Sequence, residues 1–422
     1  MSRLRTEPLT IGPDTPVVVA ARRTPTGTAG HGLARVDLAG LLAPVLTAVL
    51  ADLPAGAGPD EVVIGNCLGP GGNPARYAVL AAGLGPGVPA VTVDRQCGSG
   101  QEAVHQGATL VRAGRARLVL AGGAESASTA PYRMFRPTTP TELPRPYQRA
   151  PFAPAALGDP DMGAAADDVA RRFGITRQRQ DAYAARSHAL TLAAAGAGAF
   201  DAELVPVGGL ARDERPRPIT RAVLARLRPA FATGSDEDGQ AQAAGGPSVT
   251  AGNSCGISDG AAVVAIVPEA VRAGWGVPGL ALLDWLSVGV DPRWPGVGPV
   301  PAVDRLLSRT GLTWGQVTAV EITEAFAAQV LACTDTWGVD PFGDERVCGQ
   351  GGAIALGHPW GASGALLVVR LFARLVRSAA GPGTDAGTCA AGDTAGVVGY
   401  GLATCAVGGG QGLALVARRV GP

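Results

Sequence analysis

Residues 90–114 read AVTVDRQCGSGQEAVHQGATLVRAG, and this stretch carries the strongest indication of the fold. The β-branched residues near its start predict a short strand, and the residues from Cys97 onward have the spacing of a helix. A strand that runs directly into a helix is typical of an α/β fold with a largely buried sheet. The glycines Gly98 and Gly100 are interpreted as room for a substrate to approach.

Cys97 is the first candidate for a chemical role because it stands at the expected start of that helix. A helix N-terminus offers unpaired N–H groups and a partial positive charge. Both favour the thiolate, which is the nucleophilic form of cysteine. A free cysteine is more often a buried structural residue, so this motif alone leaves both interpretations open.

The alternation of strands and helices extends along the chain on both sides of Cys97. The segments 17–19 and 61–66 predict buried strands, and the segment 34–50 between them predicts a helix. The segment RLVLAGGAES, residues 117–126, predicts a further strand that ends at paired glycines. These elements together predict an α/β fold.

A change of composition begins at Ser126 and lasts to about Val249. Proline, arginine and short helices dominate this part, and RFGITRQRQDAYAARSHALTLAAA is its clearest helix. The run ATGSDEDGQAQAAGG before Pro247 is expected to be an exposed loop. We interpret the whole part as a lobe inserted into the α/β pattern.

The α/β pattern returns at GISDGAAVVAIV, and a second set of elements begins near Leu280. The sequence therefore predicts two similar α/β halves. The first covers residues 1–279 and includes an inserted lobe at about 126–250, and the second covers residues 280–422. The repeat rests on the pattern of elements, not on residue identity.

Charge composition limits the classes of partner. The chain has 35 basic and 35 acidic residues, and every fixed cation is arginine because the sequence contains no lysine. A net charge of zero gives no reason to expect nucleic acid or an anionic membrane. The absence of lysine excludes Schiff-base chemistry on that side chain, and leaves phosphate binding to arginine, backbone N–H groups or helix N-termini.

The seven cysteines indicate neither a disulfide framework nor a metal site. Their number is odd, and no CxxC pair or Cys/His cluster suggests zinc. The first ten residues, MSRLRTEPLT, lack the apolar run of a signal peptide, and no apolar stretch is long and clean enough to span a bilayer. We therefore expect a cytoplasmic protein with free thiols.

His358 is the second candidate, in the segment GQGGAIALGHPWGASGALLVVRLFARL. A neutral imidazole there could take the proton of a thiol and donate to a developing oxyanion. Gly-His-Pro is also a plausible turn without a chemical role. The other three histidines, His31, His105 and His188, are interpreted as surface or helix residues.

Cys405 precedes three glycines in the segment TCAVGGGQGLALV. Such a glycine run can present backbone N–H groups as a site for an anion. A turn at the end of a strand with an inert cysteine explains the segment equally well.

Seven segments in this order resemble the thiolase family, over about residues 17–420. They are RQCGSG, GGAESASTAPY, RPAF, VTAGNSCGISDGAA, TEAFAAQ, GGAIALGHPWGASGA and GLATCAVGGGQG. The resemblance implies a thiolase fold, with two βαβαβαββ halves and a loop lobe that helps to bind coenzyme A. It also implies a ping-pong reaction in which Cys97 takes an acyl group from an acyl-CoA and His358 acts as its base. A second cysteine would remove or return the α-proton of acetyl-CoA, while backbone N–H groups, including that of Cys97, form an oxyanion hole.

Two site positions depart from the family pattern. Thr323 stands where the family usually has the asparagine that holds a water beside the histidine; its hydroxyl is shorter and differently aimed. The acid/base cysteine of the family lies two residues before the triple glycine, and Ala406 occupies that position here. Because neighbouring side chains of a strand point to opposite faces, Cys405 is expected to face away from the site unless the backbone shifts locally.

The resemblance also places residues in the coenzyme A and acyl pocket. Asp161 replaces a histidine that is common in the family, and Pro295 replaces a common methionine, so we expect a reshaped pantetheine tunnel. Cys255 replaces the serine of the coenzyme-binding segment. The positions that match the pocket are Met162, Arg217, Phe231, Ala251, Cys255 and Phe326.

Three functions remain open. The first is a thiolase that makes or cleaves a 3-oxoacyl-CoA through an acyl-thioester on Cys97. The second is a thiolase-like acyltransferase or decarboxylative condensing enzyme that lacks the usual acid/base cysteine. The third is a non-catalytic subunit that binds acyl-CoA. Acyl-CoA and acetyl-CoA, or an acyl-carrier substrate, are the expected partners, without a permanently bound cofactor or metal, and the resemblance implies a homodimer or homotetramer.

Overall fold

The computed structural model describes residues 9–147, 149–231, 246–378 and 399–422. The loop expected at ATGSDEDGQAQAAGG therefore lies almost entirely outside the described residues. The predicted strands and helices of the first half are present. Its elements before the lobe are β1 (Pro16–Arg23), β2 (Gly27–Thr28), α1 (Leu38–Ala51), β3 (Glu61–Gly65), α2 (Pro74–Ala81), β4 (Ala90–Val93), the 3₁₀ turn η1 (Gln96–Gly98), α3 (Ser99–Arg112) and β5 (Val119–Glu125).

The part between β5 and β8 contains two three-residue strands and helices of 3 to 20 residues. Its elements are β6 (Arg133–Phe135), β7 (Arg145–Tyr147), η2 (Ala155–Leu157), α4 (Met162–Arg172), α5 (Arg177–Gly196) and α6 (Arg221–Ala225). The single helix predicted from Arg172 onward was wrong at its start. Gly174 has a φ of +64°, so the chain turns after the end of α4. The Thr176 side chain then caps α5 by accepting a hydrogen bond from the N–H of Arg179.

The second half repeats the α/β pattern. The first half closes with β8 (Ser258–Pro268) and α7 (Glu269–Trp275). The elements that follow are β9 (Gly279–Gly289), η3 (Pro295–Val297), α8 (Pro299–Thr310), η4 (Trp314–Gln316), β10 (Val317–Ile322), α9 (Ala327–Trp337), α10 (Ala353–Leu356), α11 (Trp360–Phe372), η5 (Ala373–Arg377), β11 (Tyr400–Val407) and β12 (Gln411–Val420).

The two halves share one strand order. The main sheet among the described residues runs β10-β11-β12-β9-β1-β8-β5-β3-β4, and the halves join where β1 pairs with β9. Counted within its own half, the first half has the order 3-2-4-5-1. The second half has the order 2-3-4-1, which becomes 2-4-5-1 when the third number is left for the segment at Val347. A parallel bridge between Val320 and Val347 lies beside β10, where the first half has its third strand. The internal repeat is thus visible in topology.

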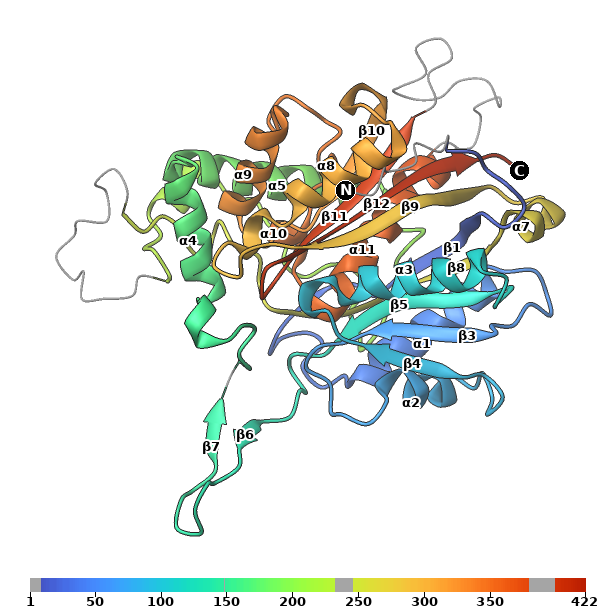
Figure 1. Ribbon diagram of the computed structural model, residues 1–422, viewed down its shortest axis with the longest axis horizontal. Helices are drawn as coiled ribbons and strands as arrows, with labels where there is room; N and C mark the ends of the chain where they lie inside the picture. The colour runs from blue at the N-terminus through green and yellow to red at the C-terminus, as the bar shows by residue number, and fades with distance from the viewer. Residues whose placement is uncertain (1–8, 148, 232–245, 379–398) are drawn as a thin grey trace.

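The helices α3 and α11 lie between the two halves of the sheet (Figure 1). Their buried side chains form one cluster with residues of β5, β8, β11 and β12. Helices α1 and α2 cover the outer face of the first half, and α8 and α9 cover the outer face of the second. The result is a stack of helix, sheet, helix, sheet and helix, in which the central helices are enclosed on both sides.

Glycines allow the central helices to pack this closely. A Cβ atom on Gly123 of β5 would lie 1.9 Å from the carbonyl oxygen of Gly361, and one on Gly100 of α3 would lie 2.7 Å from the backbone nitrogen of Ala365. A Cβ atom on Gly98 would meet Leu413 at 2.9 Å. The prediction that Gly98 and Gly100 leave room for substrate was therefore wrong, because both glycines face the interior of the protein.

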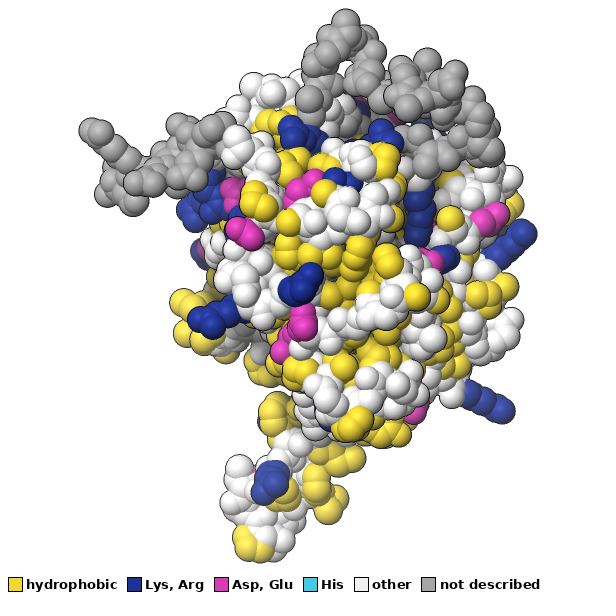
Figure 2. Space-filling view, turned by 90° about the vertical axis from the view of Figure 1, so that its right-hand side faces the viewer, with side chains coloured by type: hydrophobic (Ala, Val, Ile, Leu, Met, Phe, Trp, Pro, Cys, Tyr) yellow, Lys and Arg dark blue, Asp and Glu magenta, His cyan; other side chains and the backbone are white. Residues whose placement is uncertain are grey.

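The β6–β7 hairpin projects from the body of the molecule, and hydrophobic side chains are visible on it in Figure 2. Tyr132 is 97% exposed and Leu143 is 85% exposed. Exposed apolar side chains gathered on a projecting element indicate an interaction surface. Of the helices in the described parts of the chain, none is long and apolar enough to cross a membrane.

Candidate active site

The candidate residues gather where parallel strands end. In the first half, Cys67 follows β3, Cys97 follows β4 and Glu125 is the last residue of β5, and these three strands are parallel to one another. In the second half, Thr323 follows β10, and Cys405 lies near the end of the parallel strand β11. Ligand sites of α/β folds form at the carboxyl ends of strands, because the loops that follow them lie together there.

Cys97 lies in the 3₁₀ turn η1, directly before α3, and its side chain is partly buried. Burial raises the pKa of the Cys97 thiol to about 11, and the backbone N–H groups of Gly408 and of Cys97 itself offset part of this rise. Burial of the Cys97 thiol therefore opposes the helix N-terminus, which favours the thiolate. Desolvation outweighs the helix dipole here, so the thiol needs a base when it reacts.

His358 lies between α10 and α11, and its side chain is 2% exposed. Its Nδ1 atom is 2.6 Å from the hydroxyl oxygen of Ser363, while its Nε2 atom has no hydrogen-bond partner among the described residues. Burial lowers the pKa of His358 to about 4. The imidazole is thus neutral at pH 7, fixed by Ser363 on one side and free to act as base or donor on the other.

Cys405 is fully buried in β11, and its sulfur lies 3.4 Å from the carbonyl oxygen of Cys97 and 3.3 Å from that of Ala406, so its one proton is shared between these two acceptors. The pairing of β11 with β12 runs without a bulge from Tyr400 to Val407, so Cys405 and Ala406 point to opposite faces. The local backbone shift considered from the sequence does not occur. Cys405 reaches the backbone of Cys97 from the interior of the protein instead.

Thr323 lies beside Cys405 at the end of β10. Its side chain is buried, and its N–H donates to the carbonyl oxygen of Thr404 over 3.1 Å. Burial raises the pKa of Cys405, the nearby Cys97 adds to the rise, and the Thr323 hydroxyl offsets part of it. Cys97, Cys405 and Thr323 therefore share one environment, although Cys405 was expected to face away from the site, and the Cys405 thiol keeps its proton at neutral pH.

The segment 253–258 connects the second half of the site to the first. The N–H of Cys255 donates to the carbonyl oxygen of Ala325, and the N–H of His358 donates to the carbonyl oxygen of Gly256. The nitrogen–oxygen distance is 3.0 Å in both hydrogen bonds. Cys97 contributes to the rise of the Cys255 pKa to about 12, whose main cause is burial. The segment thus brings Cys255 into the surroundings of Cys97 and fixes the backbone of His358.

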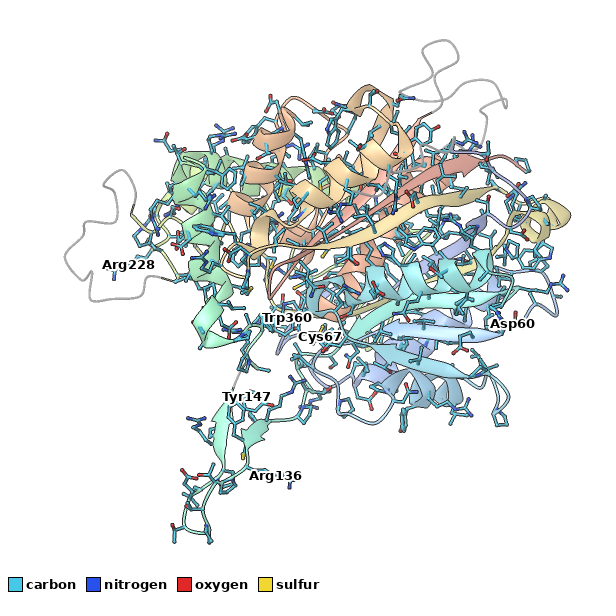
Figure 3. All side chains as sticks on the ribbon, viewed as in Figure 1. Asp60, Cys67, Arg136, Tyr147, Arg228 and Trp360 are labelled. Carbon is cyan, nitrogen blue, oxygen red and sulfur yellow. The ribbon has the colours of Figure 1, made fainter. Side chains whose placement is uncertain are left out.

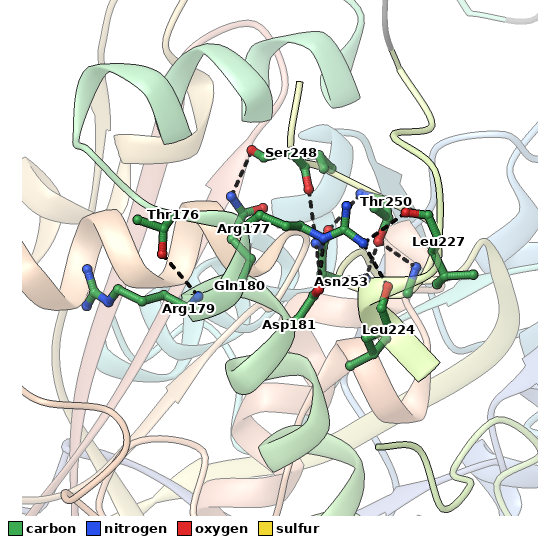
Figure 4. Close-up of polar contacts among 12 residues, drawn as sticks. Thr176, Arg177, Arg179, Gln180, Asp181, Leu224, Leu227, Ser248, Thr250 and Asn253 are labelled. Atoms are coloured by element: carbon green, nitrogen blue, oxygen red, sulfur yellow. Dashed lines mark hydrogen bonds and ion pairs between the residues drawn. The ribbon is translucent and has the colours of Figure 1, made fainter. Parts of the chain in front are cut away.

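Polar contacts with α5 hold the start of this segment in place (Figure 4). The Asn253 amide donates to Asp181 over 3.0 Å and to the carbonyl oxygen of Ser248 over 3.2 Å. The Asn253 side-chain oxygen accepts from the N–H of Thr250 over 2.8 Å. Arg177 at the start of α5 donates to the carbonyl oxygen of Leu224 over 2.7 Å. The lobe therefore positions one wall of the site.

The remaining predicted pocket positions are only partly brought together. The rings of Phe231 and Phe326 meet edge to face, with 6.1 Å between their centroids. Phe231 also packs on Gly163, next to Met162 at the start of α4. The side chains of Arg217 and Ala251 are exposed, and among the described residues no contact ties either of them to Cys97.

Three functional candidates were not identified from the sequence: Ser363, Cys67 and Glu125. Glu125 is buried and accepts hydrogen bonds from the N–H groups of Cys67, Leu68 and Gly361, which join the loop after β3 to the start of α11. Figure 3 shows Cys67 and Trp360 near one another in this region. The position of Cys67 at the end of a predicted parallel strand was a signal that could have identified it.

Comparisons with known proteins identify the family of the chain. Residues 16–270 match the model of the thiolase N-terminal domain, and residues 278–398 match that of the thiolase C-terminal domain. The chain belongs to the thiolase family. No group of three or more His, Cys, Asp or Glu side chains suited to a metal ion occurs within the described ranges of this thiolase.

Several thiolase relatives are similar over most of their length. The protein named "Putative acetyl-CoA C-acetyltransferase VraB" from Staphylococcus haemolyticus is 38% identical over 409 residues, 95% of this chain and 97% of the relative. Its namesake from Staphylococcus aureus strain MRSA252 is 40% identical over 365 residues, 84% and 92% of the two chains. The crystal structure of the Bacillus anthracis acetyl-CoA acetyltransferase superposes with a TM-score of 0.81 at 32% identity, over 96% of this chain and 99% of the other.

Proposed function

We propose that this thiolase transfers acyl groups between coenzyme A thioesters and the methyl carbon of acetyl-CoA, through an acyl-thioester on Cys97. The observation that carries the proposal is that helix α11, which follows His358, packs against the turn η1 that holds Cys97. Cys97 is a partly buried thiol, and His358 is a neutral histidine whose Nε2 atom is unpaired among the described residues. The names of the relatives and of the superposed structure, all acetyl-CoA acetyltransferases, support the substrate class.

In the first half-reaction the Cys97 sulfur attacks the thioester carbonyl carbon of an acyl-CoA. Because the pKa of Cys97 is about 11 and that of His358 about 4, an ion pair is unfavourable at rest, and proton transfer accompanies the attack. The carbon–sulfur bond to coenzyme A then breaks, and the leaving thiolate takes the proton from His358. The backbone N–H groups of Cys97 and Gly408 point to the thiol and are suited to hold the developing oxyanion.

In the second half-reaction a base must take a proton from the methyl carbon of acetyl-CoA, and we assign this step to the Nε2 atom of His358, which is unpaired in the described part of the chain. The carbanion attacks the acyl carbonyl carbon, the bond to Cys97 breaks, and the Cys97 thiolate takes the proton back from His358. Thr323 lies in the wall of the site. We assign it a supporting role in this half-reaction, in which its hydroxyl contacts a bound water or the substrate carbonyl. Coenzyme A would lie along Met162, Phe231, Phe326 and Cys255. Because the chain has no lysine, arginine is the side chain left to bind its phosphates, and Arg217 is the position that matches the family.

A decarboxylative or non-carbon acyl transfer is the second candidate function. The observation that favours it is the orientation of Cys405, which is buried, donates to the Cys97 carbonyl and points away from the face of Ala406. Loss of carbon dioxide from a malonyl-type thioester forms the carbanion without a base. A non-catalytic subunit is disfavoured because Cys97 and His358 both have surroundings suited to reaction.

One experiment separates these functions. The purified protein is incubated with acetyl-CoA alone, with acetoacetyl-CoA and coenzyme A, and with acetyl-CoA and malonyl-CoA, and the products are separated by chromatography. Thiolysis of acetoacetyl-CoA supports the first proposal. Product formation only with malonyl-CoA supports the second, and no turnover by a protein that binds acyl-CoA supports the non-catalytic subunit.

A further inference from the structure

The residue before Cys97 has an unusual backbone conformation. Gln96 has a φ of +48°, and Gln96 and Cys348 are the two non-glycine residues with positive φ in the described chain. Side-chain-bearing residues adopt this region at a cost in free energy, so the surrounding structure must hold them there. At Gln96 the strained unit is the peptide that leads directly into the candidate nucleophile.

The carbonyl oxygen of Gln96 accepts three hydrogen bonds. Ser99 donates from its backbone N–H and also from its hydroxyl, the latter over 2.6 Å. The third donor is the thiol of Cys67, whose sulfur is 3.1 Å from the same oxygen. Ser99 is held in turn, because its hydroxyl oxygen accepts from the N–H of Arg95 over 2.7 Å.

Cys67 is suited to be a permanent donor. Its backbone N–H donates to the buried carboxylate of Glu125 over 3.1 Å, which fixes its position after β3. Burial, together with the charge of Glu125, raises the pKa of the Cys67 thiol well above its ordinary value. The thiol therefore keeps its proton at neutral pH and has a hydrogen to donate.

The anchored carbonyl determines where the N–H of Cys97 points. The peptide between Gln96 and Cys97 is trans, so its C=O and N–H groups point in opposite directions. With the carbonyl held by Cys67 and Ser99, the N–H of Cys97 is aimed at its own thiol, beside the N–H of Gly408. Oxyanion-hole donors are effective when they are fixed before the charge develops.

We propose that Cys67, together with Ser99, is a positioning residue that fixes the Gln96–Cys97 peptide and so aims the N–H of Cys97 at the thioester oxyanion. The inference rests on the proposed acylation of Cys97 and adds residues to which no role had been assigned from the motifs. Cys67 acts through the Gln96 carbonyl and does not touch the substrate. Its loss should slow a step that forms an oxyanion and spare a step that does not.

Two reactions of Cys97 provide this contrast. Acylation by acetyl-CoA passes through a tetrahedral oxyanion, whereas alkylation by iodoacetamide displaces iodide at a saturated carbon and forms none. Both rates are measured on Cys97 by quenching and peptide mass analysis, in the wild type and in Cys67→Val, Cys67→Ser and Ser99→Ala. Valine is similar in size to cysteine but has no hydrogen-bond donor, whereas serine retains a donor.

We expect Cys67→Val to lower the acylation rate roughly tenfold, which is less than the loss expected when an oxyanion-hole donor is removed. The alkylation rate should stay within about twofold of the wild-type rate. Cys67→Ser should retain most of the acylation rate, and Ser99→Ala should show the same selective loss as valine. Equal losses in both reactions, or an unchanged acylation rate in Cys67→Val and Ser99→Ala, would overturn the inference while leaving the proposed function intact. A wild type that alkylates at Cys97 but never acylates would refute the proposed function and the inference with it.

Discussion

The thiol of Cys405 donates to the carbonyl oxygen of Cys97, with 3.4 Å between sulfur and oxygen. This contact explains why a cysteine can be retained one position away from the acid/base position of the family. Cys405 supports the backbone of the nucleophile from the interior, while Ala406 occupies the other face of β11. Burial raises the pKa of the Cys405 thiol, so the thiol keeps its own proton. A protonated thiol is poorly suited to remove a proton from the substrate.

Exchange of the acetyl-CoA methyl protons with deuterated water should therefore be slow in the wild type. Replacing Cys405 with alanine should change the exchange rate little and cost about 1 kcal/mol of stability through lost packing. Nuclear magnetic resonance of the methyl signal measures the exchange. Fast exchange that disappears in Cys405→Ala would show that this thiol is the base after all.

A thiol placed at the family position gives the complementary test. Ala406→Cys should accelerate methyl exchange, by as much as the roughly 10²–10⁴-fold that acid–base catalysis contributes. The matched control is Ala406→Ser, which has similar size but a much weaker acid and base. If neither variant exchanges faster than the wild type, the face of Ala406 is not directed at the substrate methyl group.

Ser363 should control the reactivity of Cys97 through His358. Ser363→Ala removes the hydrogen bond to Nδ1, so the buried ring loses its fixed orientation, and we expect acylation and alkylation of Cys97 both to slow roughly tenfold. Ser363→Thr keeps the hydroxyl and should restore most of either rate. Unchanged rates in the alanine variant would mean that backbone packing alone orients His358.

Buried histidines should make the fold sensitive to acid. His105, His188 and His358 have pKa values lowered to about 3, 4 and 4 by burial, so the unfolded chain binds more protons below pH 6.5. Their contribution is complete above the unfolded pKa and is lost as pH falls toward the folded values. The free energy of unfolding should fall between pH 7 and pH 5. In His105→Phe, which keeps a ring beside Trp285, this fall should be smaller by about 2 kcal/mol.

Urea unfolding at the two pH values measures this effect, and His31→Gln at an exposed position is the matched control. An equal loss of stability in the wild type and in His105→Phe would contradict the account, because it would assign the acid sensitivity to other groups.

The protein should be a homodimer or a dimer of dimers. Strand β4 is an edge of the described sheet, Val91 on it is 40% exposed, and Leu80 on the neighbouring helix α2 is 48% exposed. Val91→Arg should shift the mass measured by light scattering toward the monomer, because an unpaired charge would lie in an apolar contact. Val223→Arg, at a 51% exposed position on α6, should leave it unchanged. A wild type that is monomeric at micromolar concentration would refute this prediction.

The fold could be predicted from the sequence because local patterns were unambiguous. The apolar runs at 17–19 and 61–66 became the buried strands β1 and β3. The bounds of β3 agree within one residue, whereas β1 continues four residues further, to Arg23. The close packing of α3 on α11 could not be predicted, because Gly100 and Ala365 are more than 250 residues apart and their approach depends on the assembled core. The division near residue 279 stays a prediction.

The site was predictable only where chemistry and motif coincide. Cys97 and His358 could be proposed because few residues of their type stand before helices, and their roles stay predictions. Cys67 and Ser363 were missed because their roles depend on which backbone oxygen or ring nitrogen they meet. The depth of burial that raises the pKa of Cys97 could not be predicted, because it depends on the assembled core.

The central claim is that Cys97 carries the acyl group, and intact mass measurement tests it most directly. After incubation with acetyl-CoA and an acid quench, the account predicts a mass increase of one acetyl group that maps to Cys97 and is absent from Cys97→Ser. His358→Ala should form the adduct much more slowly. Acylation of Cys67, Cys255 or Cys405 instead, or an adduct that persists in Cys97→Ser, would contradict the account.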